Sequence, residues 1–283
     1  MDIERVGVVG AGLMGSGIAE VCARAGYDVL VREVNPELAE AGRGRIEKSL
    51  DRALERGKVT ESEREEALSH LALTTHLAEF SDRQFVVEAA TENEPVKLEI
   101  FSHLDGIVSE ETILASNTSS IPITRLARAT QRPDRVIGTH FFNPVPVMGL
   151  VEIVTGLLTS EETLAAARSF AESLGKQHVL SKDRAGFIVN MLLVPYLNEA
   201  VRMYQDGFAT AEDIDKAVRL GLNHPMGPLE LLDFVGIDTT KFIADILFEE
   251  FRLPQYAPPP ILTRMVEAGL LGRKTGRGFY HYQ

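Results

Sequence analysis

Short apolar runs alternate with amphipathic stretches along the first two thirds of the chain. The runs, such as Ile3 to Val9, are rich in β-branched residues, which is typical of buried strands in a parallel sheet. The stretches between them, such as 161–174, repeat apolar residues every three or four positions and predict helices. This alternation predicts an α/β fold with a doubly wound, Rossmann-type sheet. Strands are expected at 3–9, 28–31, 71–74, 85–89, 112–115, 135–142, 150–154 and 176–180, and the first helix at 18–25.

Beyond residue 183 the pattern changes to helical periodicity alone. We therefore predict a sheet domain over residues 1–183 and an all-helical domain over residues 184–283. The sheet domain also carries an inserted helical pair, because Asn35-Pro36 opens a long helix and 61–70 supplies a second one before the next strand. Helices of the second domain are expected at 187–205, 210–220, 228–235, 238–251 and 260–268.

The first strand runs into a glycine-rich turn. Gly10 permits the tight turn, Gly12 lets the backbone approach a pyrophosphate, and Gly15 lets the next helix pack close to the strand. The N-terminus of that helix offers free N–H groups and a positive dipole end to phosphates. A glycine turn without a ligand is the alternative, but the strand that follows the helix supports a dinucleotide site.

Glu33 follows the second strand and indicates which dinucleotide is bound. A carboxylate there accepts hydrogen bonds from the adenosine ribose hydroxyls of NAD and repels the 2′-phosphate of NADP. Arg32 stands next to it, and an arginine at this edge can accommodate a 2′-phosphate. The sequence therefore predicts NAD as the cofactor and leaves the degree of NADP exclusion open.

Composition and charge narrow the class of protein. The chain has 45% hydrophobic and 25% charged residues, a soluble globular profile, and no run approaches the ~18 apolar residues of a membrane span. Because the first residues also lack a signal segment, we expect a cytoplasmic protein without a membrane partner. A net charge of −12 argues against nucleic acid as a partner. The single cysteine, Cys22, is read as a core residue, and no metal site is expected.

The long helix of the inserted pair is locally basic in this acidic chain. Its basic residues recur every three or four positions and follow one face beside an acidic stripe. A solvated face with ion pairs explains such a pattern, and so does a site for a polyanionic ligand; charge alone favours the solvated face. The basic residues are Arg45, Lys48, Arg52 and Arg56, and the acidic ones are Glu47, Asp51 and Glu55.

Two further clusters carry candidate chemistry. The polar run Ser116-Asn117-Thr118-Ser119-Ser120 follows a strand at the edge where open α/β sheets bind ligands, although it would also serve as an N-cap for a helix at 122–129. His140 and Glu152 lie on successive strands across a Pro-rich turn, within possible hydrogen-bond reach. Because a carboxylate on an apolar strand is costly unless it is paired, the two residues together indicate a general base.

The chain resembles, from end to end, the short-chain 3-hydroxyacyl-CoA dehydrogenase family, and within it the bacterial 3-hydroxybutyryl-CoA dehydrogenases. The resemblance implies NAD-dependent oxidation of (S)-3-hydroxyacyl-CoA, such as 3-hydroxybutyryl-CoA, and the reverse reduction of acetoacetyl-CoA. It also implies a place in fatty acid metabolism and a homodimer formed through the helical domain. Its carriers are the Gly10–Gly15 turn, Ser116–Ser120, His140-Phe141-Phe142-Asn143-Pro144-Val145-Pro146 with Glu152, Gly186-Phe187-Ile188-Val189-Asn190, His224-Pro225-Met226-Gly227-Pro228 and Gly276-Arg277-Gly278-Phe279-Tyr280.

The resemblance further implies roles for individual residues. His140 is the general acid or base, oriented by Glu152, while Ser119 and Asn190 bind the reacting oxygen of the substrate. Ser49 and Arg56 bind coenzyme A, which reverses the preference for a merely solvated basic helix. The family often has Asp in place of Glu33 and Lys in place of Arg56, which changes reach and hydrogen-bond geometry but keeps the charge. The cofactor-binding residues are Gly10, Gly12, Leu13, Met14, Gly15, Glu33, Glu92, Lys97, Asn117 and Lys274.

Two alternatives from other functional classes stay open. A two-domain dehydrogenase of a free hydroxy acid would share the NAD domain, but such enzymes commonly use a lysine base from the helical domain, and the basic helix would have no use. A catalytically silent dinucleotide-binding protein would not require the complete set of Ser119, His140, Glu152 and Asn190. An assay with acetoacetyl-CoA and NADH discriminates between these classes.

Overall fold

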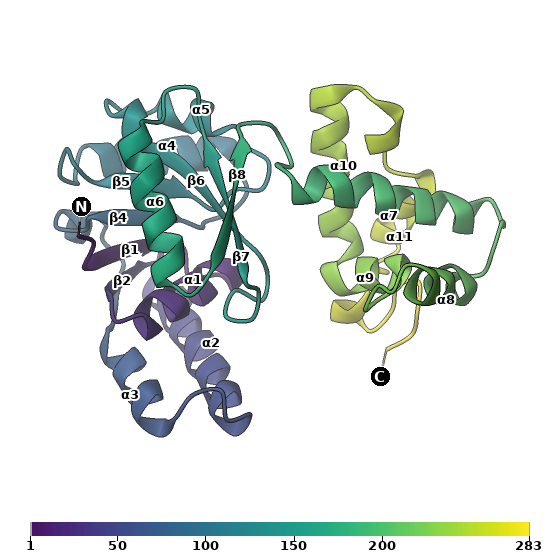
Figure 1. Ribbon diagram of the computed structural model, residues 1–283, viewed down its shortest axis with the longest axis horizontal. Helices are drawn as coiled ribbons and strands as arrows, with labels where there is room; N and C mark the ends of the chain where they lie inside the picture. The colour runs from purple at the N-terminus through teal and green to yellow at the C-terminus, as the bar shows by residue number, and fades with distance from the viewer. Residues whose placement is uncertain (1, 283) are drawn as a thin grey trace. The chain divides into compact units, whose positions relative to one another are not determined.

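The computed structural model describes residues 2–282, and the chain divides into two compact units, residues 1–183 and 184–283. The first unit is built around a β-sheet, and the second consists of helices (Figure 1).

One sheet of eight strands organises the first unit within the described residues. Its order is β3-β2-β1-β4-β5-β6-β7-β8, so the chain leaves β1 in both directions and confirms the predicted doubly wound arrangement. Neighbouring strands are parallel except β6 and β7, which pair antiparallel. The strands are β1 (Arg5–Val9), β2 (Asp28–Arg32), β3 (Leu71–Thr74), β4 (Phe85–Glu88), β5 (Ile113–Ser116), β6 (Val136–Phe141), β7 (Leu150–Thr155) and β8 (Gln177–Lys182).

Helices cover both faces of this sheet, which explains why the residues of its central strands are buried almost throughout. Helices α1, α2 and α6 contribute to one core cluster with the strands, and Phe170 of α6 stacks on Phe85 of β4 with ring centroids 4.2 Å apart. In Figure 1, α6 lies in front of the sheet, and α4 and α5 lie behind it. The helices are α1 (Leu13–Arg24), α2 (Pro36–Glu55), α3 (Glu61–Ser69), α4 (Glu94–Asp105), α5 (Ile123–Ala127) and α6 (Glu161–Ser173), with 3-10 turns at Leu77–Phe80 and Pro133–Arg135.

The start of the first helix was predicted wrongly. Helix α1 begins at Leu13, directly after its N-cap Gly12, and not at Ile18. Glycine is a poor helix former, which disfavours a helix that includes Gly15 and Gly17. Packing overrides that preference, since a Cβ on Gly15 would lie 1.8 Å from the carbonyl oxygen of Gly10. Gly15 is therefore a helical residue that allows close contact with the preceding turn.

The inserted helices α2 and α3 confirm the expected pair. Asn35 caps α2 by accepting a hydrogen bond from Leu38 N at 2.8 Å, and Pro36 occupies the first helical position. The two helices are joined by an ion pair between Arg64 Nε and Asp51 Oδ1 at 2.7 Å. The buried, free thiol of Cys22 on α1 likewise fits its expected place in the core.

The second unit packs its helices around an aliphatic core that includes Leu197, Leu229 and Leu262. Within residues 2–282, none of the helices is both long and apolar enough to span a membrane. The helices are α7 (Val189–Gln205), α8 (Ala211–Gly221), α9 (Pro228–Val235), α10 (Ile237–Phe251) and α11 (Pro260–Glu267), with 3-10 turns at Pro254–Tyr256 and Arg273–Thr275.

A buried carboxylate fastens the C-terminal segment to this unit. Asp233 on α9 is 1% exposed and accepts hydrogen bonds from the backbone N–H groups of Phe279 and Tyr280, both at 2.9 Å. The Tyr282 hydroxyl donates to the same carboxylate at 3.0 Å. Burial raises the pKa of Asp233, and these hydrogen bonds oppose the shift. The C-terminal segment therefore relies on Asp233 as the acceptor for two backbone N–H groups and for the Tyr282 hydroxyl.

Replacing Asp233 with alanine should loosen the C-terminal segment. Two backbone N–H groups lose their acceptor, so we expect the free energy of unfolding to fall by at least ~2 kcal/mol. Limited proteolysis, read by mass spectrometry, should show earlier cleavage after residue 270. The control is Asp245→Ala, which breaks a surface ion pair with Lys241 and should cost no more than ~1 kcal/mol. Equal protease resistance in both variants would contradict the proposed fastening.

Candidate active site

The parallel strands bring most of the predicted site residues to one edge of the sheet. Val9 of β1 pairs in register with Glu88 of β4, and Glu88 pairs with Ser116 of β5. Ser116 in turn pairs with Gly138, two residues before His140 on β6. The segments that follow these strand ends therefore meet at the carboxyl edge, where open α/β sheets bind ligands.

His140 and Glu152 form a hydrogen-bonded pair, as expected from the sequence. They are direct register partners on the antiparallel strands β6 and β7, and His140 Nδ1 lies 2.7 Å from Glu152 Oε2. Glu152 is fully buried and His140 is 7% exposed. The Phe142 ring packs edge-on against the imidazole, with centroids 4.6 Å apart. The imidazole is thus held through Nδ1, which is the arrangement that prepares Nε2 for proton transfer.

The glycine-rich turn between β1 and α1 has the geometry that a pyrophosphate requires. Gly10 has φ +95°, which favours glycine, and no atom lies within 4 Å of where a Cβ on Gly12 would be. Leu13 and Met14 begin helix α1, whose N-terminus points into this turn. Leu13 is 65% exposed. The space beside Gly12 and the N-terminus of a 12-residue helix together fit the phosphates of a dinucleotide.

Two side chains hydrogen-bond to the backbone of the glycine-rich turn. The N–H of Ala11 donates to Glu33 Oε1 at 2.7 Å, and the N–H of Val34 donates to Glu33 Oε2 at 3.1 Å. Arg45 Nη1 of α2 donates to the carbonyl oxygen of Ala11 at 3.0 Å. The sequence indicated Glu33 as a ribose ligand and Arg45 as part of a basic face, but it did not reveal that both residues support the turn.

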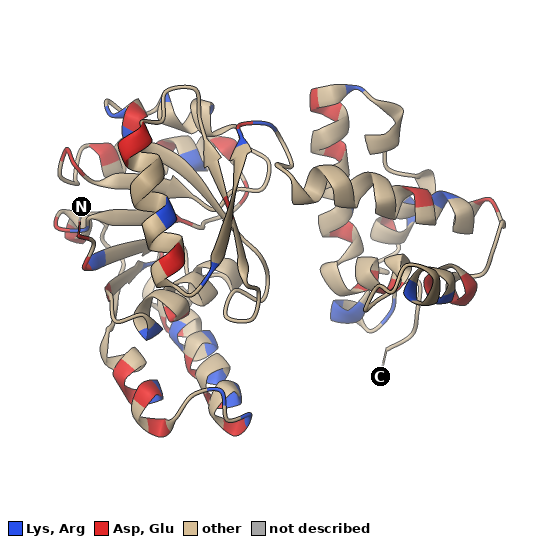
Figure 2. Cartoon of the chain, viewed as in Figure 1, with Lys and Arg blue, Asp and Glu red and all other residues tan. Residues whose placement is uncertain are grey.

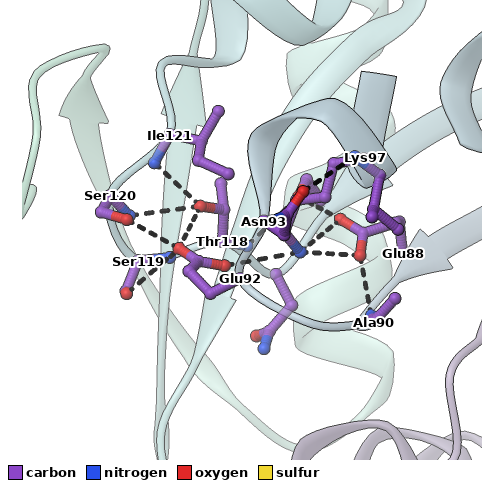
Figure 3. A network of polar contacts seen from close by, with 12 residues as sticks. Glu88, Ala90, Glu92, Asn93, Lys97, Thr118, Ser119, Ser120 and Ile121 are labelled. Atoms are coloured by element: carbon purple, nitrogen blue, oxygen red, sulfur yellow. Dashed lines mark hydrogen bonds and ion pairs between the residues drawn. The ribbon is translucent and has the colours of Figure 1, made fainter. Parts of the chain in front are cut away.

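The side chain of Glu92 holds the polar segment that follows β5 in place through hydrogen bonds (Figure 3). Glu92 Oε1 accepts hydrogen bonds from Thr118 Oγ1 at 2.6 Å, Ser119 N at 3.0 Å and Ser120 Oγ at 2.8 Å. The alternative role as an N-cap of α5 was wrong. The N-cap position is Pro122, and the N–H groups of Ile123 and Thr124 donate to Asp183.

A buried ion pair lies behind Glu92, and the sequence had indicated only one of its two residues as a site residue. Lys97 Nζ contacts both oxygens of Glu88 at 2.7 Å, and the two side chains are 1% and 0% exposed. Lys97 was predicted as a cofactor residue, whereas Glu88 was missed. The signal was present, because Glu88 ends an apolar strand and a buried carboxylate requires a partner. Asn117 lies next to this pair, and its Oδ1 accepts the N–H of Phe141 at 2.9 Å, which joins the ends of β5 and β6.

Helix α2 presents most of its basic side chains to solvent, and Figure 2 shows Lys and Arg along it, interleaved with acidic residues. Arg56 is exposed at the C-cap of α2. Ser49 is partly buried on α2 and lies near Glu20 of α1. Burial raises the pKa of Glu20, and its polar neighbours, first among them Ser49, oppose this shift. Of the two residues expected to bind coenzyme A, only Arg56 is therefore exposed.

The two remaining predicted residues belong to the helical unit and are described within it. Asn190 is the second residue of α7, and its N–H donates to the carbonyl oxygen of Gly186 at 3.1 Å. Lys274 lies in the C-terminal segment and pairs with Asp238 of α10 at 2.6 Å. In the part of the chain that the structure describes, no group of three or more His, Cys, Asp or Glu residues is arranged to hold a metal ion.

Two protein-family models match this chain, and the boundary between them, near residue 185, lies close to the boundary between the two structural units. The NAD binding domain of 3-hydroxyacyl-CoA dehydrogenase matches residues 5–184, and the C-terminal domain of 3-hydroxyacyl-CoA dehydrogenase matches residues 186–282. Together these two matches cover nearly the whole chain.

Individual proteins match over the same length. A 3-hydroxybutyryl-CoA dehydrogenase from Mycobacterium tuberculosis is 61% identical over 282 residues, with 99% of each chain covered. The crystal structure of M. tuberculosis FadB2 superposes with a TM-score of 0.99 at 61% identity, and all of both chains is covered. That of (S)-3-hydroxybutyryl-CoA dehydrogenase PaaH1 from Ralstonia eutropha gives a TM-score of 0.95 at 46% identity, again with full coverage of both chains.

The acid stability of the site should depend on Glu92. Burial alone would raise the pKa of Glu92, but the Lys97 ammonium and the donors of the 118–120 segment lower it below its usual value of 4.5. A lowered pKa stabilises the fold above the unfolded-state pKa, and this contribution is lost as pH falls through the native pKa. Glu92→Gln should therefore reduce the free energy of unfolding by about 1–3 kcal/mol at pH 7 and by progressively less below pH 4.5.

Urea unfolding between pH 3 and pH 7 measures this difference. Glu63→Gln is the control, because the pKa of Glu63 is also lowered, by hydrogen bonds from Thr60, but this carboxylate is exposed. Its substitution should have little effect at any pH. A Glu92→Gln difference that does not change with pH would mean that the charge of Glu92 does not stabilise the site.

Proposed function

Because this chain belongs to the 3-hydroxyacyl-CoA dehydrogenase family, we propose that it catalyses the NAD-dependent oxidation of (S)-3-hydroxybutyryl-CoA and related short-chain esters, and the reverse reduction of acetoacetyl-CoA. The observation that carries this proposal is the buried His140–Glu152 pair, which stands at the same sheet edge as the glycine-rich turn. The names of two relatives, both 3-hydroxybutyryl-CoA dehydrogenases, support the choice of substrate.

His140 is proposed as the general base of the oxidation. Nδ1 donates its proton to Glu152, so Nε2 is the basic nitrogen and takes the proton of the 3-hydroxyl group. Glu152 keeps this tautomer and stabilises the imidazolium that forms. In the reduction, the same imidazolium returns the proton to the developing alkoxide. Oxidation releases a proton, so lower pH favours the hydroxyacyl ester.

The dinucleotide site is proposed to use the residues of the glycine-rich turn and of the strand ends next to it. NAD supplies, when bound, the acceptor for the hydride that leaves C3 of the substrate. The turn and the first N–H groups of α1 bind phosphate, and Glu33 binds the adenosine ribose. The positions proposed on the nicotinamide side are Glu92, Lys97, Asn117 and Lys274.

Ser119 and Asn190 are proposed to bind the reacting oxygen, where donors stabilise the charge that develops. For the coenzyme A end of the substrate, the exposed guanidinium of Arg56 supports a contact with phosphate. Ser49, which is partly buried on α2, is proposed at the same end of the substrate.

We also propose a homodimer formed through the helical unit and a cytoplasmic role in fatty acid metabolism. Large exposed apolar side chains support an interface on the helical unit, among them Leu192, Phe208 and Leu220, which are 71%, 77% and 76% exposed. Isolated apolar residues are common on protein surfaces, but several of this size on one small unit favour association. The free thiol of Cys22 is compatible with a reducing compartment.

The substrate proposal is tested by following NADH oxidation with acetoacetyl-CoA and with acetoacetate. We expect turnover with the thioester at micromolar to millimolar concentrations and very little with the free acid. NADPH in place of NADH should react poorly, because Glu33 repels the 2′-phosphate. Preferential reduction of the free acid would favour a hydroxy acid dehydrogenase, and no turnover with either would favour a silent dinucleotide-binding protein.

The pair is tested by His140→Gln, Glu152→Gln and the double variant in single-turnover reduction of acetoacetyl-CoA. His140→Gln removes the proton donor, so the rate should fall by roughly 10²–10⁴-fold. Glu152→Gln leaves the imidazole poorly oriented and should also slow hydride transfer strongly. If both act on one proton, the double variant should be little slower than His140→Gln alone. Losses that multiply would contradict the pair, and thermal melts confirm that each variant is folded.

A further inference from the structure

We infer that Gly42 and Arg45 of helix α2 are positioning residues of the dinucleotide site, which set the orientation of the Ala11–Gly12 peptide in the glycine-rich turn. This inference rests on the proposed function, because it takes this turn as the place where the pyrophosphate of NAD binds. It gives the middle of α2, which lies next to α1 (Figure 1), a part in cofactor binding. The sequence indicated Arg45 only as part of a basic face, and it did not indicate Gly42.

Helix α2 reaches the glycine-rich turn through a glycine. A Cβ on Gly42 would overlap the methyl group of Ala11 and would lie 3.1 Å from the Ala11 carbonyl oxygen. This methyl group has no torsion that could move it aside, and Ala11 is only 1% exposed. Ile46 and Leu50 fix the same helix in the core cluster to which Ala11 belongs. Gly42 therefore allows a close contact between helix and turn that a larger residue would break.

Arg45 holds the same residue from the next turn of the helix. It lies three positions after Gly42, so the two residues are neighbours on one face of α2. Arg45 Nη1 donates to the carbonyl oxygen of Ala11 at 3.0 Å, while the N–H of Ala11 donates to Glu33 Oε1 at 2.7 Å. Both backbone polar groups of Ala11 are therefore engaged by side chains of the protein.

A fixed carbonyl oxygen determines where the following N–H group points. The Ala11–Gly12 peptide is trans, so its C=O and N–H groups lie in one plane and point in opposite directions. The N–H of Gly12 therefore faces away from the oxygen that Arg45 holds. Gly12 is the N-cap of α1 and forms no side-chain cap, which leaves the first donors of this helix for a ligand. Arg45 thus sets the direction of a donor at the place where the pyrophosphate is proposed to bind.

The same helix contains a matched control for each of the two residues. Arg45 is exposed, and an exposed guanidinium also attracts phosphate at a distance. Arg43 carries the same charge but pairs with Glu47 at 3.0 Å, so its removal tests charge alone. Gly44 matches Gly42, because no atom lies within 4 Å of where a Cβ on Gly44 would be. Comparison with these controls separates contact with the turn from net charge and from helix propensity.

The Kd for NADH, measured by nicotinamide fluorescence, tests the inference in Gly42→Ala, Arg45→Met and their combination. Arg45→Met removes the donor to Ala11, and Gly42→Ala pushes helix and turn apart. Each should weaken binding roughly 10-fold, which corresponds to ~1.4 kcal/mol and is the size expected for one hydrogen bond of a charged group. Because both changes act on one peptide, the double variant should bind about as weakly as the weaker-binding single variant. Arg43→Met and Gly44→Ala should stay within about twofold of the wild type.

Amide hydrogen exchange reports on the turn without any cofactor. In the free protein, the N–H of Gly10 donates to the carbonyl oxygen of Arg32 and that of Ala11 to Glu33, so both are protected. A peptide covering residues 9–12 should exchange about 10-fold faster in Gly42→Ala and Arg45→Met, and at the wild-type rate in the two controls. Thermal melts confirm folding. Because Arg45 is exposed, Arg45→Met keeps the test valid even where Gly42→Ala does not fold.

Three results would overturn the inference: NADH binding or exchange of 9–12 that is unchanged in Arg45→Met; an equal loss in Arg43→Met, which means that charge alone acts; or losses in the double variant that multiply, which means that Arg45 acts independently of the turn. A wild-type protein that binds NADH but does not reduce acetoacetyl-CoA refutes the proposed reaction and leaves this inference intact. A wild-type protein that does not bind NADH refutes the dinucleotide site and the inference with it.

Discussion

Burying a carboxylate costs free energy unless its oxygens accept hydrogen bonds, and this constraint shapes loops in both units. Glu33, Glu92 and Asp183 each accept backbone N–H groups from segments that belong to no strand. In the helical unit Asp233 does the same for the C-terminal segment. Each of these side chains costs free energy to bury, and each is compensated by donors that would otherwise be unpaired. The result is that loop shape in this chain is set by a few acidic residues.

The same constraint accounts for the way the sheet edge is organised. Strands β1, β4 and β5 pair in regular register, so their carboxyl ends lie at the same level of the sheet. Charged side chains at these ends need a partner, either an opposite charge or a hydrogen-bonding group. Glu88 is neutralised by Lys97, and Glu152 is engaged by His140. A fold that places its functional groups at the ends of rigid strands gives them fixed positions before any ligand arrives.

The sequence correctly predicted the structural elements that are determined by residues close together in the chain. Valine-rich runs and amphipathic stretches indicated the strands and helices, and Asn35-Pro36 marked the start of α2 correctly. The proximity of His140 and Glu152 was also predictable, because only a short turn separates their strands.

Long-range contacts were not predictable in the same way. Glu88 and Lys97, Asp183 and α5, and Asp233 and the C-terminal segment meet only because of the topology, and the beginning of α1 depends on packing against Gly10. The roles of the site residues remain predictions.

Glu33 has one observed contact and one proposed one, and together they limit how the chain could change its coenzyme. Its carboxylate stands where the adenosine ribose is expected, and it is also the acceptor for the N–H of Ala11 in the glycine-rich turn. A shorter or basic side chain that admits a 2′-phosphate would leave that N–H without its acceptor, while Arg45 still holds the carbonyl oxygen of the same residue. Under the proposed role of Glu33, coenzyme choice and the shape of the phosphate-binding turn are therefore linked, and a substitution at position 33 that changes the preference also removes the acceptor of the Ala11 N–H unless a second substitution restores it.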